Sequence, residues 1–109
     1  MFDWHNEKWS RGEKAIARRA YEQAYSRELT AIAGEVRRLA KRIKEPHEIW
    51  ALHDYLTKKR KAIDEKYDYR YSQLVFVFAR LIRDGWLAEE ELAGLHEDKL
   101  AEIRRVLEI

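Results

Sequence analysis

The sequence contains no cysteine, one proline and four glycines in 109 residues. The lack of cysteine excludes disulfides, thiolate metal sites, iron–sulfur clusters and cysteine nucleophiles. The longest uncharged apolar run, residues 74–79, is far shorter than the roughly 20 residues that a membrane-spanning helix needs. The first residues also lack the basic and apolar regions of a signal peptide. We therefore expect a cytoplasmic protein that does not insert into a membrane.

Charge is abundant but nearly balanced. Charged residues make up 39% of the chain, and 22 Lys and Arg against 20 Asp and Glu leave a net charge of +2, which argues against a nucleic-acid-binding protein. Residues 1–66 carry a net +5 and residues 67–109 a net −3. Hydrophobic residues still reach 46%, so the chain can bury a core, and its length fits a single domain over residues 1–109.

Helical periodicity dominates the first two thirds of the chain. Ser10 and Glu13 have the spacing of a capping box, which predicts that a helix begins at Ser10. Apolar residues then recur at steps of three and four, with a heptad spacing from Leu29 onward, and nothing breaks the pattern before Pro46. The pattern predicts one helix of about 35 residues, roughly 50 Å long, preceded by a flexible segment over residues 1–9.

The positions of the proline and the later glycines divide the chain into a stalk and a head. Pro46 suits the first turn of a second helix running to about Lys66, which would fold back on the first and form an antiparallel two-helix stalk over residues 10–66. Residues 67–109 then form a small helical head. It is expected to hold a helix from about residue 72 to 84 that ends at Gly85, an acidic turn over 89–92, and a final helix. We interpret the apolar run 74–78 as a buried helix rather than a strand, so the fold class is all-α.

One apolar stripe of the second helix predicts self-association. The second helix covers only part of the first, which leaves apolar surface that a second copy would bury. We therefore expect a homodimer joined through the stalk. The predicted interface residues are Ile49, Leu52, Leu56 and Ile63.

Beside that stripe lies a candidate partner-binding face. At 100° per residue, Trp50, His53, Asp54 and Arg60 fall within about a 120° sector of the second helix. Trp and Arg are enriched among interface hot spots, and an Asp within reach of an Arg can orient its guanidinium. The pattern equally fits a packing tryptophan beside ordinary surface charges.

Other chemistries find little support. His47, His53 and Asp54 lack a further ligand for a metal site, and the three serines have no histidine at a catalytic spacing. The basic cluster over residues 58–61 has acidic neighbours and is interpreted as solvated surface. A small all-α dimeric enzyme of the chorismate mutase type would need Arg or Lys on its apolar faces, which here carry Tyr, Leu, Ile and Val. We expect no catalytic residues, metal or cofactor.

The segment Ile49-Trp50-Ala51-Leu52-His53-Asp54-Tyr55-Leu56, with further matches around residues 24–29, 59–70 and 76–81, resembles the cyanobacterial fluorescence recovery proteins. The resemblance implies an all-α homodimer that binds the photoactivated red form of the orange carotenoid protein, through that protein's C-terminal domain. It further implies faster return to the orange form and detachment from the phycobilisome, which ends photoprotective quenching. By the same resemblance, Trp50, His53, Asp54 and Arg60 form the functional patch, Ile49 lies at the dimer seam, and Phe76 lies on a partner-binding surface of the head.

Three positions depart from the family pattern. Glu102 stands where a basic residue is expected, and Tyr69 and Tyr71 stand where smaller or polar residues are expected. Related sequences also occur in bacteria without phycobilisomes. The alternative is therefore a fluorescence-recovery-like dimer with a different partner.

Overall fold

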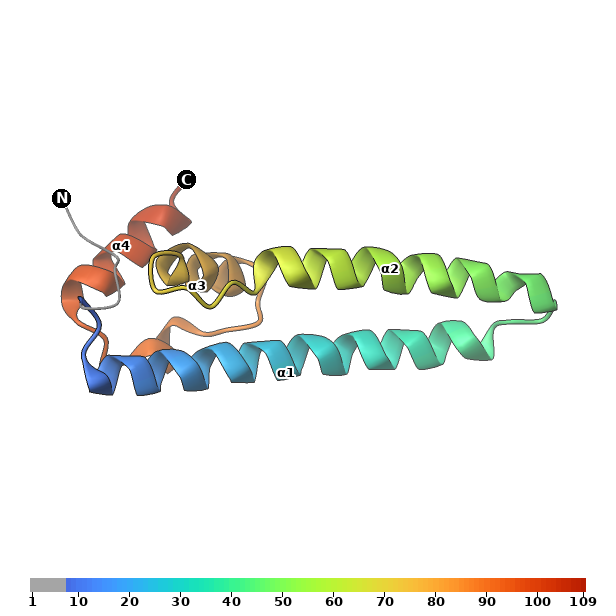
Figure 1. Ribbon diagram of the computed structural model, residues 1–109, viewed down its shortest axis with the longest axis horizontal. Helices are drawn as coiled ribbons and strands as arrows, with labels where there is room; N and C mark the ends of the chain where they lie inside the picture. Colours follow the sequence, from blue (N-terminus) through green and yellow to red (C-terminus); the bar gives the residue numbers. More distant parts are fainter. Residues whose placement is uncertain (1–7) are drawn as a thin grey trace.

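The computed structural model describes residues 8–109, and the regular structure within this range is helical, with no strand, confirming the all-α prediction. The long helix α1 (Arg11–Lys41) is followed by a 3₁₀ turn, η2 (Pro46–Glu48), and by α2 (Ile49–Lys66), which runs back beside α1 (Figure 1). Helix α3 (Leu74–Arg83), a second 3₁₀ turn, η3 (Glu89–Leu92), and helix α4 (Glu97–Leu107) gather at the end where α1 begins. The molecule is elongated, at 56 × 26 × 22 Å.

Capping and backbone geometry fix the helix boundaries. The Ser10 hydroxyl accepts a hydrogen bond from the Glu13 amide at 3.1 Å, and the Glu13 carboxylate accepts one from the Ser10 amide at 2.9 Å, so the capping box is confirmed. Helix α1 has 31 residues and ends at Lys41, earlier than expected. Glu45 is extended because the residue before a proline avoids helical geometry. Gly85 has a φ of 84°, the left-handed conformation expected where α3 ends.

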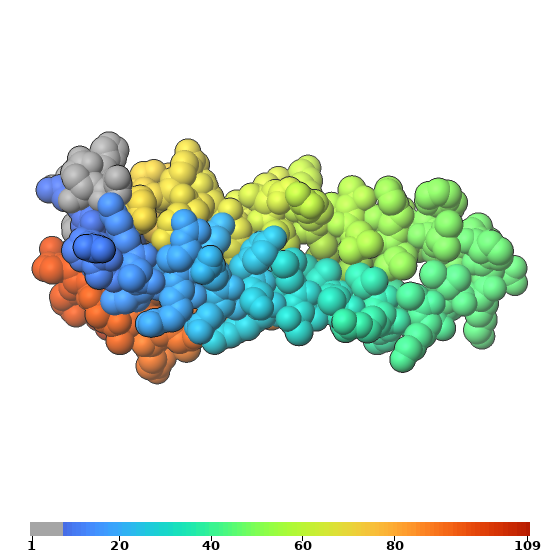
Figure 2. Space-filling view, turned by 60° about the horizontal axis from the view of Figure 1, so that its bottom comes forward, coloured from blue at the N-terminus to red at the C-terminus, as the bar shows by residue number. Residues whose placement is uncertain are grey.

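The hydrophobic core lies at the head end and includes the first half of α1. Leu74, Phe78 and Leu81 of α3, with Leu92 and Ile103, are fully buried. Figure 2 shows the N-terminal half of α1 lying over the head segments, while the rest of α1 and α2 project beyond them. The predicted boundary between stalk and head at residue 66 therefore leaves out residues 11–28, which also contribute to the core of the head.

Small side chains explain how α1 fits there. Ala17, Ala20 and Ala24 are all buried, at steps of three and four that place them on one face of the helix. Their size lets the α1 backbone approach the head closely.

The beginning of the described chain is packed rather than loose. Residues 1–7 of the segment expected to be flexible lie outside the described residues. Trp9, in contrast, is buried at 3% exposure. Its ring lies 5.6 Å from the Tyr71 ring, and the Lys99 ammonium lies 4.9 Å from its centroid. Trp9 therefore belongs to the core of the head.

Candidate functional site

Three of the four residues predicted for the partner-binding face of α2 form an exposed cluster. Trp50 is 63% exposed, and its ring meets the His53 ring edge to face at 6.1 Å. The His53 Nδ1 atom lies 3.6 Å from the Asp54 carboxylate. A tryptophan left this open contributes little to packing within its own chain, so the surface is available to a partner.

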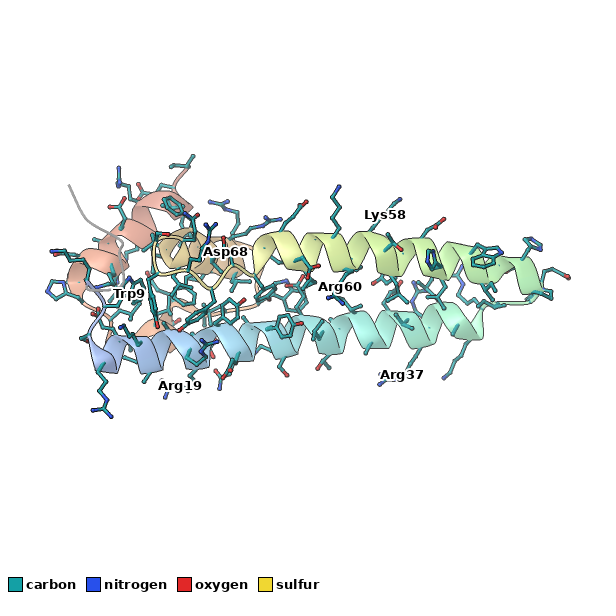
Figure 3. The ribbon with its side chains drawn as sticks, in the orientation of Figure 1. Trp9, Arg19, Arg37, Lys58, Arg60 and Asp68 are labelled. Carbon is teal, nitrogen blue, oxygen red and sulfur yellow. The ribbon has the colours of Figure 1, made fainter. Side chains whose placement is uncertain are left out.

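The fourth predicted residue, Arg60, is oriented by a different acid from the one the sequence suggested. Its Nε atom donates to both carboxylate oxygens of Asp64, at 3.2 and 3.1 Å, one helical turn toward the end of α2. The Asp54 carboxylate lies instead beside the His53 ring. In Figure 3, Arg60 lies on the side of α2 turned toward α1, whereas Lys58 points away.

Phe76 lies apart from this cluster. It is 47% exposed on α3 between the buried residues Val75 and Val77, so its side chain faces outward from the head. Because α3 and the start of α2 lie at opposite ends of the molecule, one chain does not bring Phe76 and Trp50 together (Figure 1).

The residues expected at the dimer interface differ in how much of each side chain is exposed to solvent. Ile49 is 46% exposed and Leu56 is 42% exposed, and Leu52 is half-buried. Ile63, however, is only 5% exposed because it packs into the core of its own chain. The prediction that Ile63 lies at the interface is therefore corrected, because its side chain has almost no exposed surface that a second copy could cover.

A buried polar cluster joins α1, α2 and α3. The Lys66 ammonium lies 2.8 Å from the Glu28 carboxylate and 3.4 Å from that of Asp84. The Tyr67 hydroxyl donates to the other Glu28 oxygen at 2.8 Å. Burial and this carboxylate neighbour raise the pKa of Tyr67 well above its ordinary value. The cluster fixes the point where α2 enters the head.

Two further contacts hold α1 against the head. The buried Glu13 carboxylate accepts from the His96 amide at 2.8 Å and pairs with Lys99 at 3.0 Å. Arg27 donates to both oxygens of Glu91 at 2.7 Å and to the Trp86 carbonyl at 3.1 Å. The Arg27 guanidinium and the Ala88 amide lower the pKa of Glu91 to about 2.

Sequence reasoning missed these contacts because their partners are far apart along the chain. For α1, the sequence did carry a signal for packing against the head. Positions 13, 17, 20, 24 and 28 recur at helical spacing and carry only Ala or Glu. Such a stripe indicates a closely packed face with an acid at each end.

The three positions at which other residue types were expected make local contacts. Tyr69 and Tyr71 are half-buried, and the Tyr69 ring meets that of Tyr21 at 4.8 Å. Burial and the neighbouring Tyr71 raise the pKa of Tyr69 to about 12. Glu102 pairs with Arg105 on α4.

Candidate small-molecule sites are shallow. An open hollow of about 490 Å³ lies between α1 and α2 and is lined by Tyr21, Tyr25 and Tyr67 together with Asp64. Among residues 8–109, no group of three or more His, Asp or Glu side chains could hold a metal ion. Within the same range, no helix is long and apolar enough to cross a membrane.

The fold and this surface define the class: a small all-helical protein with an exposed aromatic and charged face on one helix. A family model described as the photoprotection regulator fluorescence recovery protein matches residues 9–107. The chain belongs to the fluorescence recovery protein family, whose members are photoprotection regulators rather than a known class of enzymes.

Relatives agree in sequence and in structure. The fluorescence recovery protein of Synechocystis sp. (strain ATCC 27184 / PCC 6803 / Kazusa) is 41% identical over 96 residues, 88% of each chain. The structure of the Fremyella diplosiphon fluorescence recovery protein matches with a TM-score of 0.87 and 48% identity, over 93% of this chain and 99% of that one. The structure from Synechocystis sp. PCC 6803 has the same TM-score and coverage at 39% identity.

Proposed function

We propose that this protein binds the photoactivated red form of the orange carotenoid protein through that protein's C-terminal domain. It accelerates the return to the orange form and promotes detachment from the phycobilisome, ending photoprotective quenching. Family membership supports the role. The observation that carries the proposal is the open position of Trp50, beside His53 and Asp54, on a helix face not needed for packing within the chain.

Such an activity requires no covalent step. A regulator accelerates closure of a two-domain partner when it binds the barrier state more tightly than the separated state. It must also lose affinity for the closed product, because equal affinity for both states shifts no equilibrium. Exposed aromatic and charged groups on the rigid helix α2 suit this kind of recognition.

We further propose that the active form is a homodimer joined along the α1–α2 hairpin. No residue from 29 to 62 is buried, although this stretch carries Leu29, Ile49 and Leu56 with about two fifths of their surface exposed. A second copy seated on this surface would bury it.

Sedimentation at tens of micromolar tests the dimer. The native chain should sediment as a dimer and Ile49→Glu as a monomer, because the interface would bury an unpaired carboxylate. Lys58→Glu places the same carboxylate on α2 where the native side chain points away from α1, and it should remain dimeric. A monomeric native chain would exclude this assembly.

The function is tested by mixing the protein with photoconverted orange carotenoid protein in darkness and recording the return of the orange absorption. Excess native protein should accelerate the return, whereas Arg60→Leu should not. Lys58→Leu removes one positive charge from the same helix and should behave as native. An unchanged rate with excess native dimer would reject this partner and favour the alternative, a family member that regulates a different protein.

A further inference from the structure

The Arg60 guanidinium bonds to Asp64 through its Nε atom and not through its terminal nitrogens. Both hydrogen bonds to Asp64 come from Nε, at 3.2 and 3.1 Å. Within residues 8–109, no hydrogen bond joins either terminal nitrogen of Arg60 to another group of the chain. The side chains are 80% and 61% exposed, so the outer edge of the guanidinium faces solvent.

Helix stability does not account for the acid at position 64. Asp64 lies in the last turn of α2, where the helix dipole disfavours a negative charge. Its basic partner precedes it by four residues, which is the weaker order for an ion pair on a helix. An exposed pair of this kind stabilises a helix only slightly.

The surroundings of the pair suit a docking role. Arg60 and Asp64 line an open hollow of about 500 Å³ on α2 together with His53, and Leu56, which is expected at the dimer interface, borders the same hollow. Asp64 also lines the tyrosine hollow between α1 and α2. Asp64 therefore borders both hollows, and the hollow that it shares with Arg60 reaches His53 of the cluster that contains Trp50.

We propose that Asp64 is a positioning residue for Arg60 and that the outer edge of Arg60 receives a carboxylate side chain of the partner protein. The two terminal amino groups of a guanidinium match the two oxygens of a carboxylate. Because Asp64 engages only Nε, it fixes the side chain without occupying that edge. This inference rests on the proposed function and adds the chemistry by which Arg60 acts.

Substitutions at position 64 test the positioning role. Asp64→Asn should raise the concentration needed for half-maximal acceleration by about threefold to tenfold, because an ordered guanidinium becomes free to move. Asp64→Glu keeps the charge within reach of Nε and should restore most of the activity. Glu90→Gln makes the same change in net charge at an exposed residue of η3, outside this hollow, and should act as native.

Nuclear magnetic resonance of the free chain provides a readout that does not need the partner. The Nε–H signal of Arg60 should be resolved and slow to exchange in the native chain and in Asp64→Glu, and lost in Asp64→Asn. An identical signal in Asp64→Asn would overturn the positioning role, as would native activity of Asp64→Asn or an equal loss in Glu90→Gln. If the native chain fails to accelerate the reaction, the proposed function fails, and this signal still decides the role of Asp64.

The carboxylate is tested on the partner. Each exposed Asp or Glu of the partner's C-terminal domain is changed to its amide. One such change should weaken binding as Arg60→Gln does, and the two together should cost no more than either alone. Full additivity at every position would overturn a carboxylate as the group that Arg60 binds.

Discussion

The head and the outer hairpin, which is residues 29–62, differ in how much of their apolar surface is buried within one chain. At the head, α3, η3, α4 and residues 11–28 enclose fully buried apolar side chains, and the acids Glu13 and Glu28 are each paired with a lysine. Along residues 29–62 no side chain is buried. The head is therefore a complete core, whereas the outer hairpin offers surface.

This difference indicates where stability and function reside. Removing a packed side chain from the head lowers the free energy of unfolding, because it leaves a cavity or an unpaired buried charge. Loss of an exposed group on the outer hairpin costs little stability, and under the proposed function it would remove a contact with the partner. The following substitutions test that division in order of their expected effect on unfolding, all at one protein concentration.

The largest effect is expected at Phe78. Phe78→Ala should lower the free energy of unfolding by about 3–5 kcal/mol, because the side chain is fully buried in α3. Phe76→Ala removes the same side chain two residues earlier, from a site that is 47% exposed, and should stay within about 0.5 kcal/mol of native. Denaturant unfolding measures both, and equal losses would refute the assignment of the core to one face of α3.

The next effect is expected at the junction of α1, α2 and α3. Lys66→Met should cost about 3 kcal/mol, because the Glu28 carboxylate would remain buried without its cation. Adding Glu28→Gln should recover part of the loss, since the uncompensated charge is then removed. Costs that simply add in the double variant would show that the two groups do not interact.

A smaller, pH-dependent effect is expected at Glu91. Its pKa falls from an ordinary value near 4.3 to about 2 in the folded chain, so the ionised form stabilises the fold. This contribution is fully present above about pH 5 and is lost as the pH falls through about 2. The stability difference between the native chain and Glu91→Gln, followed by denaturant unfolding, should shrink over that range; a constant difference would contradict it.

The smallest effect on unfolding is expected at Trp50. Trp50→Ala should change the free energy of unfolding by less than about 0.5 kcal/mol, because the side chain is 63% exposed. The same variant should fail to accelerate the recovery of the orange carotenoid protein. Circular dichroism during denaturation and the dark recovery assay measure the two effects. A large loss of stability would place Trp50 in the core of its own chain.

Local patterns were sufficient for most of the fold. The capping box at Ser10, the left-handed Gly85 and the apolar periodicity predicted where the helices begin or end, because each signal acts within a few residues. The helical spacing also placed Trp50, His53 and Asp54 on one face, and the structure leaves all three exposed.

Contacts between distant segments were beyond this reasoning. Ile63 has the same spacing as Ile49 and Leu56, yet it is buried because α2 reaches the head at that point. Periodicity gives the face of a helix but not what covers it. The pairing of Arg60 with Asp64 rather than with Asp54 is different, because it is local: residues four apart are neighbours on a helix and residues six apart are not, so helical spacing could have predicted it.

The sequence by itself determined the all-helical fold class, the order of the helices and the aromatic and charged face of α2, since these follow from local spacing and residue type. Only the tertiary structure decided that residues 11–28 belong to the head and that Trp9 is buried there. It also decided which ion pairs form, among them Lys66 with Glu28 and Arg27 with Glu91. These features depend on close approach between residues far apart in the chain, which the apolar core brings together.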